Sequence, residues 1–116
     1  MGGKERAGPR MTIPTQLVLR ALLAEPAREM YGLQICAAAG LPSGTIHPIL
    51  ARLEHEHGWL TSRWEDIKPA DEGRPRRRYY RLTDGGAERA RVALARAAAS
   101  AGTTIGLRAR PVGNLS

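Results

Sequence analysis

Four arginines lie in one short, turn-rich segment and could bind phosphate groups. They are Arg74, Arg76, Arg77 and Arg78, and they follow Gly73 and flank Pro75. A planar guanidinium binds phosphate oxygens through paired hydrogen bonds, and the glycine and proline restrict the turn so that these groups are presented to a partner. Asp71 and Glu72 offset part of the charge. The segment predicts contact with a polyanion.

A second set of polar residues lies on one face of a predicted helix. In the segment 41–58 a buried stripe is predicted from apolar residues at helical spacing, namely Ile46, Ile49, Leu50 and Leu53. The other face carries mostly short residues that permit close approach to DNA: Ser43, Gly44, Thr45, His47, Pro48 and Arg52. We expect Ser43 to cap the helix, its first amides to bind a phosphate, and His47 and Arg52 to reach base edges. Pro48 removes one backbone hydrogen bond and should bend or loosen the first turn of a helix that nevertheless forms.

The remaining ionisable residues do not assemble into a catalytic or metal site. His55 and His57 alternate with Glu54 and Glu56, but residues two apart on a helix point to different sides and cannot share one ion. The sequence has no glycine-rich loop for phosphates and no nucleophile paired with a base. We therefore expect no enzymatic activity, no metal and no cofactor.

Length and charge narrow the class of protein. The 116 residues suit one small domain with an appended helix, and a net charge of +7 attracts polyanions, nucleic acid first among them. No apolar run approaches the roughly eighteen residues that span a bilayer, so no membrane contact is expected. The one cysteine, Cys36, is expected to be a small buried hydrophobe, and the N-terminus lacks the pattern of a secretion signal; both favour a reducing, cytoplasmic location.

Three helices and a hairpin would position the two polar sets. Helical spacing predicts helices over 14–25, between Tyr31 and Gly40, and within 41–58. Alternation of period two predicts two antiparallel strands, 60–65 and 77–82, joined by a polar loop over 69–75. The predicted fold is mainly α with a small β-hairpin: a winged helix-turn-helix over 13–83.

The ends of the chain are predicted to differ from this domain. Thr83 caps a last helix over 84–100, while residues 1–12 and 101–116 lack periodicity and are predicted to be a disordered arm and tail. Along the helix a narrow stripe of small residues could join two copies of the chain: Ala87, Ala90, Leu94, Ala97 and Ala101. Packing of this stripe on the first helix of the same chain is the alternative.

The two tryptophans are predicted to belong to the core. Trp59 stands where the third helix meets the first strand, and Trp64 occupies an inward position of that strand. A ligand pocket lined by these rings is the alternative, and the sequence identifies no effector.

Three segments resemble the PadR-like transcriptional regulators, over roughly residues 17–94. The first is Ser43-Gly44-Thr45-Ile46-His47-Pro48, followed by Leu50, Arg52-Leu53-Glu54 and Gly58. The second is Gly73-Arg74-Pro75-Arg76-Arg77, leading into Tyr79-Tyr80-Arg81-Leu82-Thr83 and Gly86, and the third is Tyr31-Gly32. The family usually has tyrosine where this chain has His47, and the single last helix resembles its short form.

The resemblance implies a homodimer that binds a partly palindromic operator on double-stranded DNA and represses promoters. In some members a small aromatic or drug-like ligand releases the DNA. Since a fold does not determine a function, two alternatives stay open: a winged-helix adaptor that binds proteins without DNA specificity, and an RNA-binding winged helix.

Overall fold

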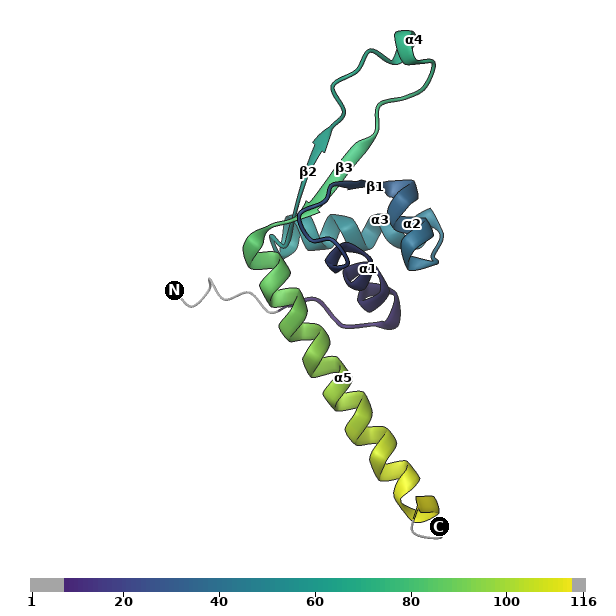
Figure 1. Cartoon of the computed structure of the whole chain (residues 1–116), viewed down its shortest axis with the longest axis vertical. Helices are drawn as coiled ribbons and strands as arrows, with labels where there is room; N and C mark the ends of the chain where they lie inside the picture. The colour runs from purple at the N-terminus through teal and green to yellow at the C-terminus, as the bar shows by residue number, and fades with distance from the viewer. Residues whose placement is uncertain (1–7, 114–116) are drawn as a thin grey trace.

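Three short helices form the body of the molecule, and a β-hairpin and a long helix extend from it in opposite directions (Figure 1). The computed structural model describes residues 8–113, with side-chain surroundings up to residue 102. The body contains α1 (Ile13–Leu23), β1 (Met30–Tyr31), α2 (Gly32–Ala39), α3 (Ser43–Ala51) and its π-helical continuation η2 (Arg52–Glu56). The hairpin, here called the wing, comprises β2 (Leu60–Trp64), α4 (Pro69–Glu72) and β3 (Arg78–Leu82), and α5 (Asp84–Gly113) follows it.

The helix ends follow from local chemistry. Thr12 caps α1, its Oγ1 accepting a hydrogen bond from the Thr15 amide at 3.3 Å. Gly40, at φ 71°, ends α2 as predicted, because only glycine adopts this left-handed conformation without steric cost. The prediction that Ser43 caps α3 is wrong: Pro42 holds the cap position without a side-chain bond, and Ser43 is the first helical residue.

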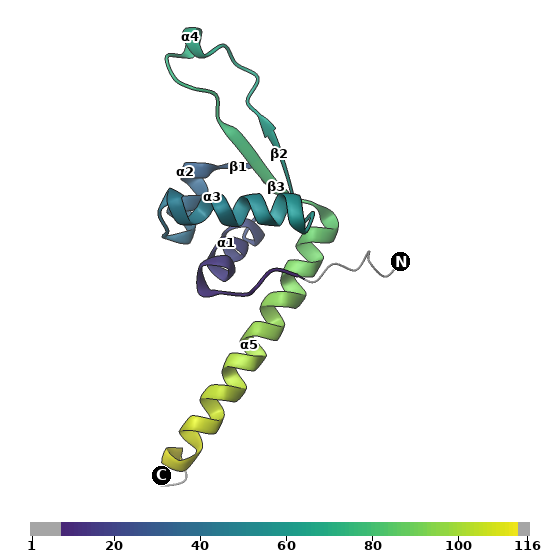
Figure 2. The same ribbon diagram turned by 180° about the vertical axis from the view of Figure 1, so that it is seen from behind.

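The core lies between the three helices and the root of the wing. The predicted stripe on α3 is confirmed, since all four of its apolar residues are buried, at most 4 % exposed. Val18 and Leu22 of α1, Ile35 of α2 and Leu82 of β3 complete the contact. Figure 2 shows α3 lying across the body between α2 and the start of the wing, and this helix packs on both α1 and α2.

Pro48 leaves α3 regular, and the helix widens further along. The carbonyl that loses its partner is that of Gly44, which is exposed, so water can replace the missing amide. The π-helical turn begins at Arg52, where the His57 amide donates to the Arg52 carbonyl at 3.2 Å. The predicted loosening of the first turn is therefore wrong, and the irregularity lies at the other end of the helix.

The sheet has three strands in the order β1-β3-β2, all antiparallel. The predicted hairpin is confirmed, with Leu60 opposite Leu82 and Trp64 opposite Arg78. The third strand, β1, was not predicted, because two residues are too few to show alternation. It pairs Tyr31 with Tyr79, whose rings meet edge to face at 5.7 Å.

The prediction that Trp64 belongs to the core is wrong. Trp59 is 5 % exposed as predicted, but Trp64 is 58 % exposed although it lies on the same face of β2 as buried Leu60. The hairpin extends beyond the helices of the body (Figure 1), so α1, α2 and α3 do not cover its far end. The alternation of residues along β2 correctly placed Trp64 on the same face as Leu60. It could not show how far along the strand the core extends.

The predicted arm, loop and tail are shorter than expected. Met11 packs against the core and Gly8 lies beside the Trp59 ring, while residues 1–7 are outside the described part. The predicted loop over 69–75 contains one helical turn, α4, which ends at Gly73. Likewise α5 does not end at Ser100 but continues to Gly113; only 114–116 of the predicted tail fall outside the described residues.

Part of the predicted dimer stripe is used inside the chain. Ala87 and Ala90 are 7 % and 0 % exposed, and they belong to the same core as α1. The alternative, packing on the first helix, therefore holds for these two residues. Leu94 and Ala97 are half-buried, and the helix beyond them points away from the body.

The tip of the wing is held by one carboxylate. Glu65 accepts hydrogen bonds from Nη1 and Nη2 of Arg74 at 2.7 and 2.9 Å and from the Arg77 amide at 3.1 Å. These bonds, that from the Arg74 guanidinium above all, lower the pKa of Glu65 to about 2. The interaction closes the hairpin between the end of β2 and the start of β3.

We expect Gly86→Ala to destabilise the protein by about 3 kcal/mol, because the added Cβ would lie 2.1 Å from the Trp59 carbonyl oxygen, a backbone atom that cannot move aside. Gly85→Ala is the matched control, since its Cβ would meet only the end of the Arg89 side chain at 3.8 Å. It should stabilise α5 slightly. Urea unfolding of the two variants measures this difference, and equal stabilities would contradict the predicted clash.

The Glu65 interaction should also make the wing sensitive to acid. Because the pKa of Glu65 is lower in the folded chain than its usual 4.5, its contribution is complete above that pH and is lost as the pH falls towards 2. The melting temperatures of the wild type and Glu65→Gln should therefore differ at pH 7 and converge near pH 2. Glu25→Gln, which removes an exposed ion pair with Arg28 in the turn after α1, is the control. A Glu65→Gln difference that stays constant over this range would count against the assignment.

Candidate nucleic-acid interface

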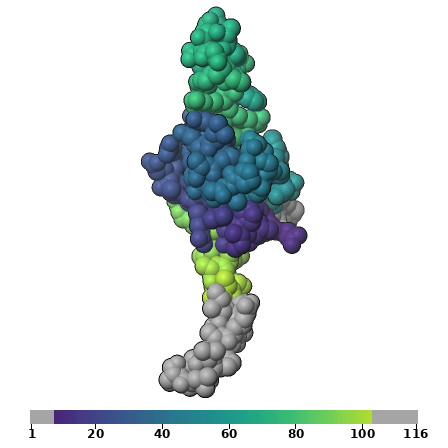
Figure 3. All heavy atoms as spheres, turned by 90° about the vertical axis from the view of Figure 1, so that its right-hand side faces the viewer, coloured from purple at the N-terminus to yellow at the C-terminus, as the bar shows by residue number. Residues whose placement is uncertain are grey.

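A groove of about 450 Å³ lies between the helical body and the outer part of the wing strands. The start of α2, the first turns of α3 and the arginine segment of the wing form its walls. Figure 3 shows α2 and α3 together on one face of the body with the wing rising above them. Two segments about thirty residues apart in the sequence, Ser43–His47 and Arg74–Arg78, thus meet at one surface.

The helix side of the groove presents Ser43 and His47. Both are exposed, and Ser43 stands at the start of α3, where the first amides have no partner within the helix and the helix dipole favours an anion. His47 lies on Gly32, the first residue of α2: a Cβ at that position would be 3.2 Å from His47 Cε1. The absence of a side chain at Gly32 therefore gives the imidazole its place in the groove.

The wing side presents all four predicted arginines, but their charges are not equally available. Arg74 is paired with Glu65, and Arg78 Nη2 lies 3.5 Å from Glu54 Oε1. Arg76 and Arg77 form no ion pair with any residue of the described part. Arg76 donates to the Ile67 carbonyl at 3.0 Å, and the Arg77 guanidinium stacks on the Tyr31 ring at 4.2 Å. The free positive charge of the groove comes from these two residues.

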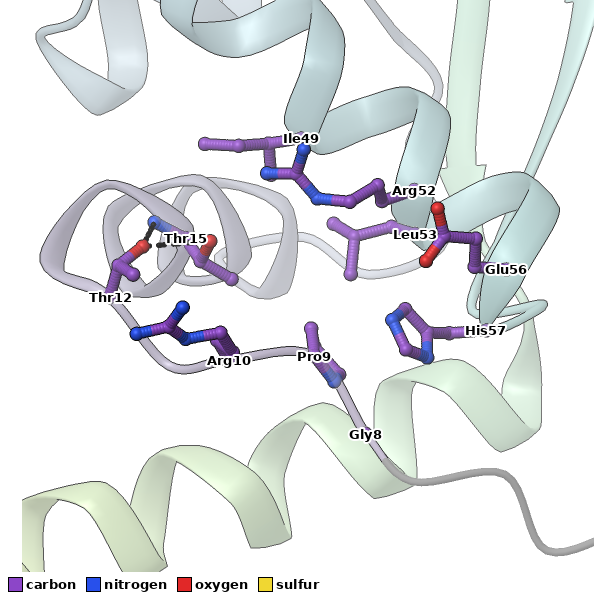
Figure 4. Close-up of a pocket in the computed structure, with 10 residues that line it drawn as sticks. All are labelled: Gly8, Pro9, Arg10, Thr12, Thr15, Ile49, Arg52, Leu53, Glu56 and His57. Carbon is purple, nitrogen blue, oxygen red and sulfur yellow. Dashed lines mark hydrogen bonds between the residues drawn. The ribbon is translucent and has the colours of Figure 1, made fainter.

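Arg52 does not face this groove. It lines a separate hollow of about 580 Å³ between α3 and the N-terminal segment, together with Arg10, Glu56 and His57 (Figure 4). Five helical positions separate it from His47, which turns the two side chains to different sides of the helix. Gly44, Thr45 and Pro48 do not line either hollow. Of the six residues predicted on this helix, Ser43 and His47 therefore line the groove, whereas Gly44, Pro48 and Arg52 are exposed outside it.

Sequence reasoning did not place Tyr31, Leu33 or Trp64 at this surface, although all of them line the groove. Tyr31 is brought there by the short strand β1, and Leu33 is 70 % exposed at the start of α2. In the sequence, the Tyr31-Gly32 pair indicated only a resemblance to the PadR-like regulators and not a place at this surface. Its place immediately before a helix of the helix-turn-helix could have identified it as part of the surface.

The described part of the chain contains neither a metal-binding cluster nor a membrane-spanning helix. No group of three histidine, cysteine or acidic side chains within residues 8–113 is arranged to hold a metal ion. In the same part of the chain, no helix combines the length and apolarity needed to cross a membrane.

Comparisons with known proteins agree with this architecture. A solved structure titled a PadR family transcription regulator from hypervirulent Clostridium difficile R20291 has a TM-score of 0.54 and 20 % identity, and the match covers 90 % of this chain and 97 % of that one. A possible transcriptional regulator from Methanosarcina mazei Go1 has a TM-score of 0.56 and 16 % identity, covering 87 % of this chain and 78 % of that one. A search of curated proteins found no match.

The sequence itself carries the family assignment. Residues 18–92, from α1 into α5, match the model of the transcriptional regulator PadR-like family. This range includes α2, α3 and the whole wing, the elements that form the groove. The chain belongs to the PadR-like family of transcriptional regulators, and it is a DNA-binding regulator with a winged-helix fold.

Proposed function

We propose that this regulator binds a partly palindromic operator as a homodimer and represses the promoter that carries it. The observation that supports sequence-specific DNA binding is the groove between α3 and the wing, where an exposed helix start faces two unpaired arginines. A helix start of this kind fits the major groove, and a basic hairpin beside it fits the adjoining phosphates or the minor groove.

Within this arrangement the residues have different roles. Ser43 and the first amides of α3 bind a phosphate, and His47 reaches a base edge. Gly44, Thr45 and Pro48 keep that end of α3 narrow enough to approach the bases. Arg76 and Arg77 bind phosphates, whereas Arg74 and Arg78 are engaged by carboxylates and hold the wing in shape.

Dimerisation is proposed through the part of α5 that leaves the body. Ala87 and Ala90 are covered by the core, so contact between two copies would use Leu94, Ala97 and the exposed residues beyond them. Val92, at 42 % exposure, adds apolar surface to this helix. The small core of a chain without phenylalanine gains stability from such a contact. A symmetric dimer would also explain an operator with two related half-sites.

Selection of bound sequences from a random duplex pool tests the proposal directly. We expect an enriched inverted repeat, with half-sites separated by about one helical turn, and a dimer by light scattering at micromolar concentration. Duplex RNA should compete poorly, since α3 cannot read its narrow major groove. A protein that retains no duplex DNA at low salt would instead be the protein-binding adaptor, and strong competition by duplex RNA would favour the RNA-binding alternative.

Arg76→Ala should weaken binding to all DNA sequences similarly and reduce the slope of log K against log salt by roughly one, because one phosphate contact is lost. The matched control is Arg20→Ala, which removes the same charge from an exposed position on α1 outside the groove. Titrations at several salt concentrations measure both slopes. Equal reductions in the two variants would mean that Arg76 acts only through the overall charge of the protein.

A further inference from the structure

Trp64 is a large apolar side chain left exposed within a basic groove. It lines the groove described above and also a neighbouring hollow of about 590 Å³ formed with Pro69, Pro75 and Arg76. Its indole therefore lies between the two hollows, beside one of the unpaired arginines. Leu33 adds apolar surface to the groove from α2. Exposed apolar surface of this kind, surrounded by polar residues, is typical of a contact site.

The indole is also held in position. The Arg78 guanidinium lies over the Trp64 ring at 5.4 Å. Arg78 Nε donates to Ser62 Oγ at 3.0 Å, and Ser62 Oγ donates in turn to Glu54 Oε2 at 2.6 Å. Glu54 belongs to η2, so this chain of contacts connects the continuation of α3 to the wing. A ring fixed in this way loses little conformational freedom when it binds a partner.

The surroundings identify the chemistry of that partner. A surface that fits Trp64 and Arg76 together must offer an apolar face next to a negative charge. The DNA backbone does so, because each deoxyribose ring lies between two phosphates. We propose that Trp64 is a DNA contact of the wing, with its indole packed on deoxyribose while Arg76 binds the adjoining phosphate. Arg78 is a positioning residue that keeps the indole in place.

This inference rests on the proposed DNA binding, and salt dependence separates the two. Trp64→Ala should weaken operator binding roughly tenfold, since burial of part of an indole is lost. Its salt slope should equal that of the wild type, because no charge is removed, in contrast to Arg76→Ala. Trp64→Phe should stay within about threefold of the wild type, since it keeps an aromatic ring on the Arg78 guanidinium. Thermal unfolding of each variant shows whether the wing remains folded.

Ile13→Ala is the matched control. It removes an apolar side chain that is 66 % exposed on α1, outside the groove, and it should leave affinity unchanged. Folded Trp64→Ala with wild-type affinity, or with a reduced salt slope, would overturn the inference while leaving DNA binding intact. So would a Trp64→Ala variant that binds less only because its dimer dissociates, since Trp64 would then contact a second copy. A wild-type protein that binds no DNA would refute the proposed function instead.

Fluorescence gives a second readout with operator DNA. The only other tryptophan, Trp59, is buried, so DNA should quench or shift the emission of the wild type through Trp64 alone. Trp64→Phe should bind with little change in emission. An emission change in Trp64→Phe equal to that of the wild type would assign the signal to Trp59 and contradict the contact.

Discussion

The close approach of two backbone segments, at Trp59 and Gly86, fixes the relation between the three parts of this molecule. The Trp59 amide donates to the Leu53 carbonyl at 2.8 Å, and its own carbonyl accepts from the Thr83 amide at 2.9 Å. Thr83 then caps α5 by accepting from the Gly86 amide at 2.8 Å. Trp59 thus connects η2, the root of the wing and the start of the last helix. The absence of a side chain at Gly86 lets these segments meet.

The arginines of the segment 74–78 fall into two pairs, one held by carboxylates of the same chain and one without such a partner. Of the four arginines in the segment 74–78, two are engaged by Glu65 and Glu54, and two have no acidic partner in the described residues. The engaged pair closes the tip and connects the wing to η2, so the free pair is presented on a defined surface and not on a flexible loop. One arginine of each pair also lies over an aromatic ring: Arg77 over Tyr31 and Arg78 over Trp64. The groove is therefore basic and apolar at once.

Much of the fold could be predicted because its signals are local. The apolar stripe of α3, the Gly40 stop and the Thr83 cap each depend on residues a few positions apart, and the alternation within β2 and within β3 is equally local. The candidate site was predicted less well. Ser43, His47 and the arginines do meet in the groove, but Arg52 faces another hollow, and Trp64 was assigned to the core. The error at Trp64 concerns which neighbours cover a side chain, and strand periodicity does not contain that information.

The sequence by itself determined the helices of the body, the hairpin, the basic character of the wing and the family, since these depend on residue type and short-range spacing. Only the tertiary structure decided which arginines are free, where the core ends along the wing, and that β1 carries Tyr31 to the groove. It also showed that Ala87 and Ala90 are buried within one chain. The physical reason is that ion pairs and burial are set by distances between segments remote in sequence, such as Glu54 and Arg78, which meet only when the helices and the sheet have packed.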